Sequence, residues 1–243
     1  MHYKLLTLFA LIDCSETYLR GYKNNGIYLL WLQQGYRFGL FYCDMDTMSE
    51  LTNKRGWAVF QKRFNGVVNF DRKWNEYSKG FGTLNGEHWA GLENIFSVTR
   101  QLYSEAKVKR IQPPRLRIDF EDWDGLRLYV EIDKFVVRGA EDQYRISALG
   151  SAYGSATYID SNRASMPGGV VFSTTDNDNT YRKCPTRRNG GWWFPRECGL
   201  SNLNGHYSKS YAYMDFYHMY WHAWPEIVGR STALRRVSMK IQH

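Results

Sequence analysis

None of the short motifs that mark the common catalytic sites occurs in the 243 residues. The sequence has no Gly-x-Ser-x-Gly nucleophile turn, no His-Glu-x-x-His zinc motif and no Gly-x-x-x-x-Gly-Lys phosphate loop. The four cysteines have no Cys-x-x-Cys spacing, which disfavours a zinc site. We therefore expect no enzyme activity. Only a glycoside hydrolase stays open by this criterion, because its two carboxylates need only lie close in space.

Long apolar runs are also missing, as are internal repeats and Asn-x-Ser/Thr sequons. No segment is long enough to span a bilayer. The apolar stretch from Leu5 to Ile12 looks like the core of a short signal peptide, but no small-residue cleavage pattern follows it before Cys14. We expect residues 1–13 to be a signal remnant or an N-terminal extension, although they could equally supply the first strand. Residues 14–243 are expected to form a single domain.

The chain is basic, with a formal net charge of +8, but it contains no run of five like charges. Its cations include five adjacent pairs, at residues 54–55, 62–63, 109–110, 187–188 and 235–236. A solvated surface with spread charge explains this pattern; attraction to anionic glycans or membrane surfaces is the alternative. Because no zinc finger or RNP-like segment accompanies the charge, we expect no nucleic-acid partner.

Short apolar runs alternate with Gly, Asn and Asp clusters and predict strands near residues 26–30, 38–43 and 57–60. Period-two alternation at 116–120 and 128–132, around Asp124-Gly125, predicts a hairpin. The acidic group in this segment is therefore assigned a structural role; it comprises Asp119, Glu121, Asp122 and Asp124. Helices are expected at 94–103 and 71–77. After Gly150 the composition predicts a loop-rich region that needs internal fixing.

Eight segments in the same order as a known family give the chain its clearest signature. They are residues 41–45 (Phe-Tyr-Cys-Asp-Met), 56–63, 79–89, 117–122, 172–174, 191–193, 198–205 and 238–241. Each is weak alone, but together they span Cys14 to Ile241. The chain resembles the fibrinogen C-terminal, or fibrinogen-related, domain family.

The resemblance implies an α+β fold in three parts: a small N-terminal lobe, a central mainly antiparallel sheet with short helices, and a loop-rich C-terminal lobe. It also implies secretion and the disulfides Cys14–Cys43 and Cys184–Cys198. From the cysteines alone, three pairings would remain open. Members of the family act as lectins, clotting proteins, matrix modules or growth-factor-like ligands.

The family's calcium site uses two carboxylates two residues apart, followed by loop carbonyls. By this alignment the first ligand falls on Asp178 and the second on Thr180, which carries no charge. Asp176 and Asp178 could form a shifted pair, or the segment could be a simple turn capped by its own side chains. With fewer charged ligands, calcium binding should be weak or absent.

The family's ligand pocket lies beside the second disulfide. Acetyl-binding lectins place a histidine after the second cysteine, where this chain has Gly199, and Arg188 replaces a pocket tyrosine. Tyr211 and Ala212 match another pocket element. This pattern is nearer the angiopoietin and angiopoietin-like branch than the acetyl-binding lectins. Arg188 and Tyr211 favour an anionic or protein partner, because both residue types are enriched at interfaces.

We thus expect a secreted recognition domain that binds a glycan or a protein through its C-terminal lobe, in innate defence or cell signalling. The first alternative is a growth-factor-like receptor ligand, and the second is a glycoside hydrolase. The high aromatic content, 16%, fits a rigid binding protein.

Overall fold

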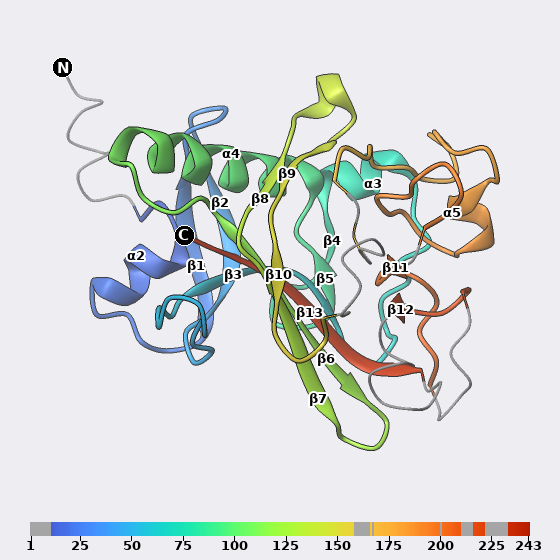
Figure 1. The fold of residues 1–243 in the computed structure, drawn as a ribbon, viewed down its shortest axis with the longest axis horizontal. Coiled ribbons are helices and arrows are strands. Elements are labelled where there is room, and N and C mark those ends of the chain that lie inside the picture. The colour runs from blue at the N-terminus through green and yellow to red at the C-terminus, as the bar shows by residue number, and fades with distance from the viewer. Residues whose placement is uncertain (1–10, 158–165, 167, 200, 210–215, 222–232) are drawn as a thin grey trace.

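A computed structural model describes residues 11–157, 166, 168–199, 201–209, 216–221 and 233–243. Their main sheet has nine strands, ordered β1-β2-β3-β13-β6-β7-β10, with β4 and β5 attached beside β3 (Figure 1). The bounds are β1 Gly26–Leu32, β2 Arg37–Asp44, β3 Trp57–Arg63, β4 Phe81–Gly82, β5 His88–Trp89, β6 Arg115–Asp122, β7 Arg127–Ile132, β10 Ala152–Tyr153 and β13 Leu234–Gln242. All of these pairings are antiparallel.

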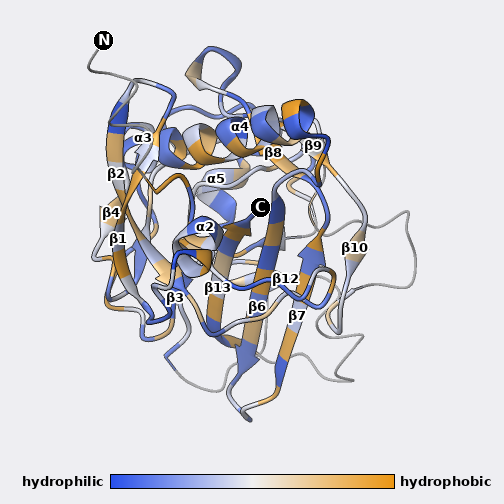
Figure 2. Cartoon of the chain, turned by 90° about the vertical axis from the view of Figure 1, so that its left-hand side faces the viewer, coloured by the Kyte–Doolittle hydropathy of each residue, from blue (hydrophilic) through white to orange (hydrophobic). Residues whose placement is uncertain are grey.

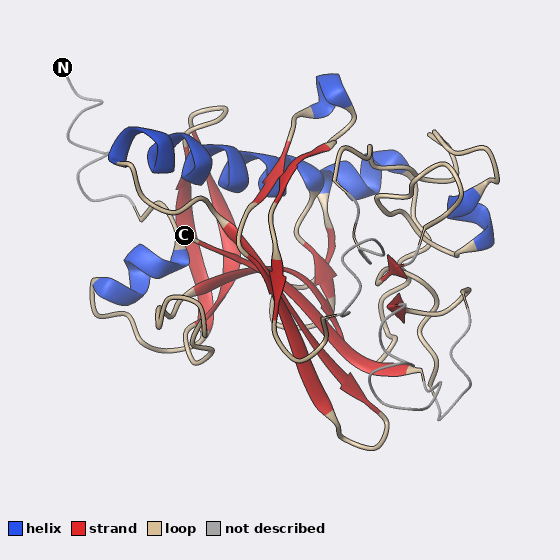
Figure 3. Ribbon diagram, in the orientation of Figure 1, coloured by secondary structure: helices blue, strands red, loops and turns tan. Residues whose placement is uncertain are grey.

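Two smaller sheets and a few helices surround this sheet. The sheets pair β8 (Phe135–Val137) with β9 (Ile146–Leu149), and β11 (Ser201–Asn202) with β12 (Tyr220–Trp221). The helices are α2 (Cys14–Leu19), α3 (Trp74–Lys79), α4 (Leu92–Lys109) and α5 (Cys184–Arg187), with a 3-10 turn at Ala140–Asp142. Figure 3 shows strands concentrated in the centre and loops around α5. The α+β architecture expected from the sequence is confirmed.

Helix α4 is longer than the predicted span of residues 94–103. Its buried stripe begins at Leu92 and continues through Ile95, Val98 and Leu102 to Ala106, so packing extends past the residues with the clearest periodicity. The helix stops at Arg110, whose φ of 55° is left-handed. Among the described residues, no helix is long and apolar enough to cross a membrane.

The predicted hairpin is confirmed as β6 and β7, joined by a turn in which Gly125 has φ 82°. The Asp122 carboxylate accepts hydrogen bonds from the backbone N–H groups of Asp124 and Leu126, at 2.9 Å each. In such a turn the acid organises backbone donors. The structural role assigned to this acidic segment therefore agrees with the geometry.

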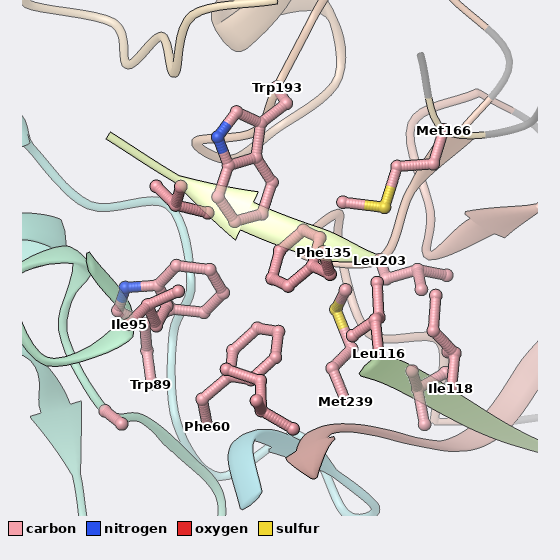
Figure 4. Packing of buried hydrophobic residues seen from close by; sticks show 14 of the residues in the cluster. Phe60, Trp89, Ile95, Leu116, Ile118, Phe135, Met166, Trp193, Leu203 and Met239 are labelled. Atoms are coloured by element: carbon pink, nitrogen blue, oxygen red, sulfur yellow. The ribbon is translucent and has the colours of Figure 1, made fainter. Parts of the chain in front are cut away.

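The core joins the sheet, α4 and the C-terminal lobe through large aromatic side chains (Figure 4). The Trp89 and Trp193 rings lie 6.0 Å apart, and Phe172 contacts both, at 5.9 and 5.1 Å. Phe60 and Phe135 stack at 6.2 Å on the same cluster. Because one continuous cluster includes residues from all three regions, burial favours folding them together.

The first disulfide, Cys14–Cys43, joins the start of α2 to strand β2. This is the pairing that the family resemblance implies. Gly56, with φ 88°, passes so close that a Cβ would lie 2.2 Å from the carbonyl oxygen of Cys14. Only glycine fits there.

The end of β3 fastens the C-terminal lobe to the sheet. The fully buried Arg63 donates from Nη1 to the carbonyl of Gly205 at 3.0 Å, and Gln61 donates to the carbonyl of Leu203 at 2.9 Å. Burial lowers the pKa of Arg63 to about 10, and the charge of nearby Glu87 opposes that effect. Arg63 therefore stays charged at neutral pH.

Glu87 holds the loop that follows β3. Its carboxylate accepts four backbone N–H groups at 2.7–3.0 Å, those of Phe64, Asn65, Gly66 and Val68. Burial alone would raise the pKa of Glu87, but these hydrogen bonds bring it below its usual range.

Lys240, on β13, is a buried cation held between two carboxylates. Its Nζ lies 2.7 Å from Asp44 Oδ2 and 2.6 Å from Asp119 Oδ2. The Thr47 hydroxyl donates to Asp44 and accepts from Lys240. Burial would raise the pKa of Asp44, but Lys240 and Thr47 lower it to about 2.

Replacing Asp44 with Asn should lower the free energy of unfolding by about 2 kcal/mol at pH 7. A depressed carboxyl pKa contributes stability above the unfolded value of 3.8 and loses it as the pH falls toward about 2. The difference between wild type and Asp44→Asn should therefore shrink between pH 4 and pH 2. Urea unfolding across this range measures it, and a difference independent of pH would contradict the assignment.

Replacing Glu87 with Gln should cost about 2–3 kcal/mol, because an amide oxygen cannot replace a charged acceptor and the amide N–H₂ would face a donor. Glu76→Gln is the matched control, since Glu76 is an exposed partner of Arg72. Urea unfolding of the two variants provides the comparison. Equal losses of unfolding free energy in the two variants would show that the four backbone hydrogen bonds to Glu87 add no more stability than one exposed ion pair.

Candidate binding site in the C-terminal lobe

The C-terminal lobe is built on two buried tryptophans and two buried asparagines. Trp193 donates to the carbonyl of Tyr144 at 2.8 Å, and Trp192 donates to the Ser201 hydroxyl at 3.2 Å. Asn202 donates to the carbonyl of Arg188, and Asn204 donates to that of Gly191. Side-chain donors thus satisfy loop carbonyls that no strand partner reaches, as a long irregular segment requires.

The second disulfide, Cys184–Cys198, closes the loop that carries this lobe's surface. It again matches the pairing implied by the resemblance. Cys184 begins the one-turn helix α5, which has Pro185 in its first turn and is followed directly by Arg188 as its C-cap residue. The bond therefore fixes the position of Arg188 relative to the segment around Cys198.

The segment from Asp176 to Thr180 makes specific contacts within the fold. Asp176 Oδ1 accepts the N–H of Trp74 at 2.9 Å, which caps the start of α3. The Thr180 hydroxyl donates to Asp178 Oδ1 at 2.6 Å and accepts the N–H of Cys184 at 2.9 Å. One oxygen of each aspartate is therefore engaged in turn and cap bonds.

No group of three or more His, Cys, Asp or Glu side chains within the described ranges is arranged to hold a metal. The Thr180 hydroxyl links Asp178 to the backbone of Cys184 at the second disulfide. Weak or absent calcium binding stays a prediction.

Arg188 lies on a half-exposed aromatic ring. Its guanidinium carbon is 3.9 Å from the centroid of Phe216, which is 48% exposed. Phe216 in turn packs edge-on against Tyr220 at 4.6 Å. The stacking holds the planar guanidinium in one orientation beside the exposed ring.

Next to Arg188, Asn189 donates to the Tyr217 hydroxyl at 3.1 Å. Asn189 also lines a groove of about 610 Å³ between the loop 66–71 and the residues 205–209. His206 and His218 line the same groove, with ring centroids 5.6 Å apart. The groove thus joins the C-terminal lobe to the loop held by Glu87.

The backbone at Gly199, where acetyl-binding lectins have a histidine one residue later than the second cysteine, has its own steric requirement for glycine. Its φ is 63°, and a Cβ there would lie 2.7 Å from Cδ and Cγ of Pro195. Any other residue would meet both backbone strain and a clash. This is a physical reason why a side chain is disfavoured at this position in this chain.

The structure describes two of the four ligand-binding residues predicted from the sequence. It places Arg188 on Phe216 and Gly199 against Pro195. Tyr211 and Ala212 lie outside the described residues.

Sequence reasoning missed Phe216, Tyr217 and the groove of Asn189. Their residues come from four separated segments, near 63–71, 189, 205–209 and 216–218, so spacing gives no signal of their proximity. The run of aromatic residues around 216–221 was the available hint.

Replacing Gly199 with Ala should destabilise the fold by about 1–3 kcal/mol. Gly125→Ala is the matched control, because Gly125 also has positive φ but open space at its Cβ position. The difference between the two variants in urea unfolding isolates the contact with Pro195. If both cost the same, backbone conformation alone sets the requirement for glycine.

Comparison with known proteins gives a consistent result. The family model described as "Fibrinogen beta and gamma chains, C-terminal globular domain" matches residues 10–243. Angiopoietin-2 of Canis lupus familiaris is 38% identical over 233 residues, which is 95% of this chain and 42% of that protein. Angiopoietin-related protein 7 of Mus musculus is 34% identical over 240 residues, 96% of this chain and 64% of that protein. The chain thus spans about half the length of these relatives.

Solved structures agree with the sequence matches. The fibrinogen-like globe domain of human ANGPTL2 superposes with a TM-score of 0.80 at 30% identity, covering 96% of this chain and 98% of that one. The lamprey fibrin D-dimer, complexed with the peptide Gly-His-Arg-Pro-amide, gives 0.73 at 26% identity, covering 94% and 72%. The chain belongs to the fibrinogen C-terminal domain family, in its angiopoietin-like branch.

Proposed function

We propose that this chain is an extracellular recognition domain that binds a protein partner through the surface around Arg188 and Phe216. The two disulfides support an oxidising compartment, because such bonds persist outside the cytosol. The relatives are named angiopoietins and angiopoietin-related proteins, so a growth-factor-like role with a cell-surface receptor ectodomain as partner is favoured.

The observation that carries this proposal is the Arg188–Phe216 stack. Arginine and large aromatic residues dominate binding energy at protein interfaces. Here Phe216 is 48% exposed and Arg188 is partly buried, beside Tyr217, whose hydroxyl accepts a hydrogen bond from Asn189. A residue pair already stacked before binding loses little conformational freedom on association.

A neutral acetylated sugar fits this surface less well. Gly199 offers no side chain where acetyl-binding relatives use histidine, and Arg188 brings a permanent charge. Among the similar structures, the lamprey fibrin fragment is complexed with a peptide. A peptide or protein ligand is therefore the better chemical match, with glycan binding as the second candidate.

We infer that the domain acts by binding and not by catalysis. The described carboxylates with close partners serve turns, caps and ion pairs, as in Asp122, Asp176 and Glu87. Hydrolysis of a glycoside substrate by the pure protein would overturn this inference.

A screen of receptor ectodomains and of a glycan array, with and without calcium, identifies the partner. Arg188→Ala and Phe216→Ala should then each weaken the captured partner's binding by about thirtyfold or more. Arg182→Ala is the control, since it removes an exposed arginine that pairs with Glu197 in the same lobe. Surface plasmon resonance measures the affinities, and melting curves check the fold.

Unchanged affinity in both variants would place the site elsewhere. Tight binding of N-acetylglucosamine by the wild type would contradict the choice of a protein partner.

A further inference from the structure

One face of the central sheet is polar and forms a second groove, distinct from the C-terminal lobe's surface. Alternate residues of β13, β6 and β7 point to opposite faces, and Figure 2 shows the alternating hydrophobic and hydrophilic bands. The inward side chains, such as Ile118 and Met239, enter the core. The outward ones line a groove of about 580 Å³ together with the end of β3.

Charges at one end of this groove are matched. Arg117 lies 2.8 Å from Asp119 and 2.7 Å from Glu131, and Lys240 lies between Asp44 and Asp119. The Arg117 guanidinium also stacks 4.1 Å from the centroid of Tyr129. Two cations here face three carboxylates, so this end has no excess of positive charge.

At the other end, three arginines surround Glu121, the one carboxylate that pairs with them in the part of the chain that the structure describes. Glu121 is 9% exposed and lies 2.9 Å from Arg127, 3.5 Å from Arg236 and 3.6 Å from Arg235. Only the first distance is a good hydrogen-bond length. The side chain of Arg127 is 75% exposed, and those of Arg235 and Arg236 are 40% and 49% exposed.

An irregularity in the sheet creates this cluster. The register between β13 and β6 shifts from Leu234 opposite Asp122 to Arg236 opposite Glu121, so Arg235 is an extra residue. In a regular strand, consecutive side chains point to opposite faces. The bulge instead lets two consecutive arginines reach the same carboxylate.

Lys62 extends the positive surface from β3. It lies opposite Ser238 of β13, and its Nζ is 4.6 Å from the centroid of Tyr42. Burial lowers the pKa of Lys62, and the positive charges of Arg236 and Lys240 act in the same direction while Asp44 opposes them.

We propose that the cluster of Arg127, Arg235, Arg236 and Lys62 binds a sulfated glycosaminoglycan chain. Guanidinium groups bind sulfate with paired, charge-assisted hydrogen bonds. Among the described residues, Glu121 is the one carboxylate that pairs with the three arginines, so the cluster is cationic and a chain of repeated sulfates would neutralise it. The net charge of +8 adds a long-range attraction for such a polyanion.

A linear polysaccharide can contact several strands at once. The groove is lined by residues of four strands, β3, β6, β7 and β13, and Phe64 and Tyr129 are among its lining residues. This surface shares none of the residues of the Arg188–Phe216 site. The domain would therefore hold a matrix glycan on the sheet face while the C-terminal lobe stays open for its own partner.

Isothermal titration of the whole chain with a heparin hexasaccharide tests the proposal. The wild type should bind, and the affinity should fall as salt is raised, because ion pairing is screened. The double variant Arg127→Ala with Arg236→Ala should lose about tenfold or more in affinity. A charge-matched control, Arg20→Ala with Lys23→Ala, removes two exposed cations from the N-terminal lobe and should lose little.

A third variant separates binding from folding. Glu121→Gln removes the carboxylate that pairs with all three arginines, so it should tighten hexasaccharide binding by about threefold, even if it lowers the melting temperature. A purely structural role for the ion-pair cluster would produce weaker binding or none. Arg188→Ala should leave hexasaccharide affinity unchanged whether or not the proposed function holds.

Three results would overturn the proposal. Equal losses in the groove variant and its charge-matched control would show attraction to net charge alone. Equal binding of a fully desulfated hexasaccharide would remove sulfate as the recognised group. Binding to phosphatidylserine vesicles through the same arginines, with no hexasaccharide binding, would identify a membrane surface as the partner.

Discussion

The rest of the structure depends on the junction at the end of strand β3. Gln61 and Arg63 donate to the carbonyls of Leu203 and Gly205. The Glu87 carboxylate accepts hydrogen bonds from the N–H groups of the loop that follows the strand. A loop-rich lobe has few ladder hydrogen bonds of its own, so these charged, buried contacts replace them. Together with the aromatic cluster of Trp89, Phe172 and Trp193, they make the lobe an extension of the sheet. The groove beside Asn189 exists because both of its walls are held by this junction.

The sheet's two faces then serve different purposes. Its apolar face packs against the core. On its outer face, Lys240 and Arg117 each form ion pairs with two carboxylates. The three arginines around Glu121 instead share one carboxylate among the described residues. Buried ion pairs fix geometry more than they add stability. Unmatched exposed arginines add little to stability in either direction, which leaves them available for binding. The domain therefore presents two chemically different surfaces, an aromatic–arginine site on the lobe and a cationic groove on the sheet.

Local patterns in the sequence were enough to predict the hairpin at residues 116–132, because alternation and an Asp-Gly turn agree there. Ordered family motifs predicted the architecture and implied both disulfide pairings. Contacts between residues far apart in the chain could not be predicted from the sequence. The bulge at Arg235 cannot be read from the residues, since register is set by the neighbouring strand. The sequence also gives no sign that the Thr180 hydroxyl bonds both Asp178 and the N–H of Cys184. The partner of Arg188 is a ring 28 positions later, and nothing in the spacing of the two residues predicts that contact.

Native-state hydrogen exchange of the unmodified chain tests the central claim most directly: that the C-terminal lobe is fixed to the sheet before any partner binds. The amides of Phe64, Asn65, Gly66 and Val68, which donate to Glu87, report on the junction. If the junction is rigid, they exchange only with global unfolding, at the same free energy as the amides within β3 and with the same dependence on denaturant. Exchange through a low-energy local opening that is insensitive to denaturant, while β3 stays protected, would show that the lobe moves independently and would contradict the account.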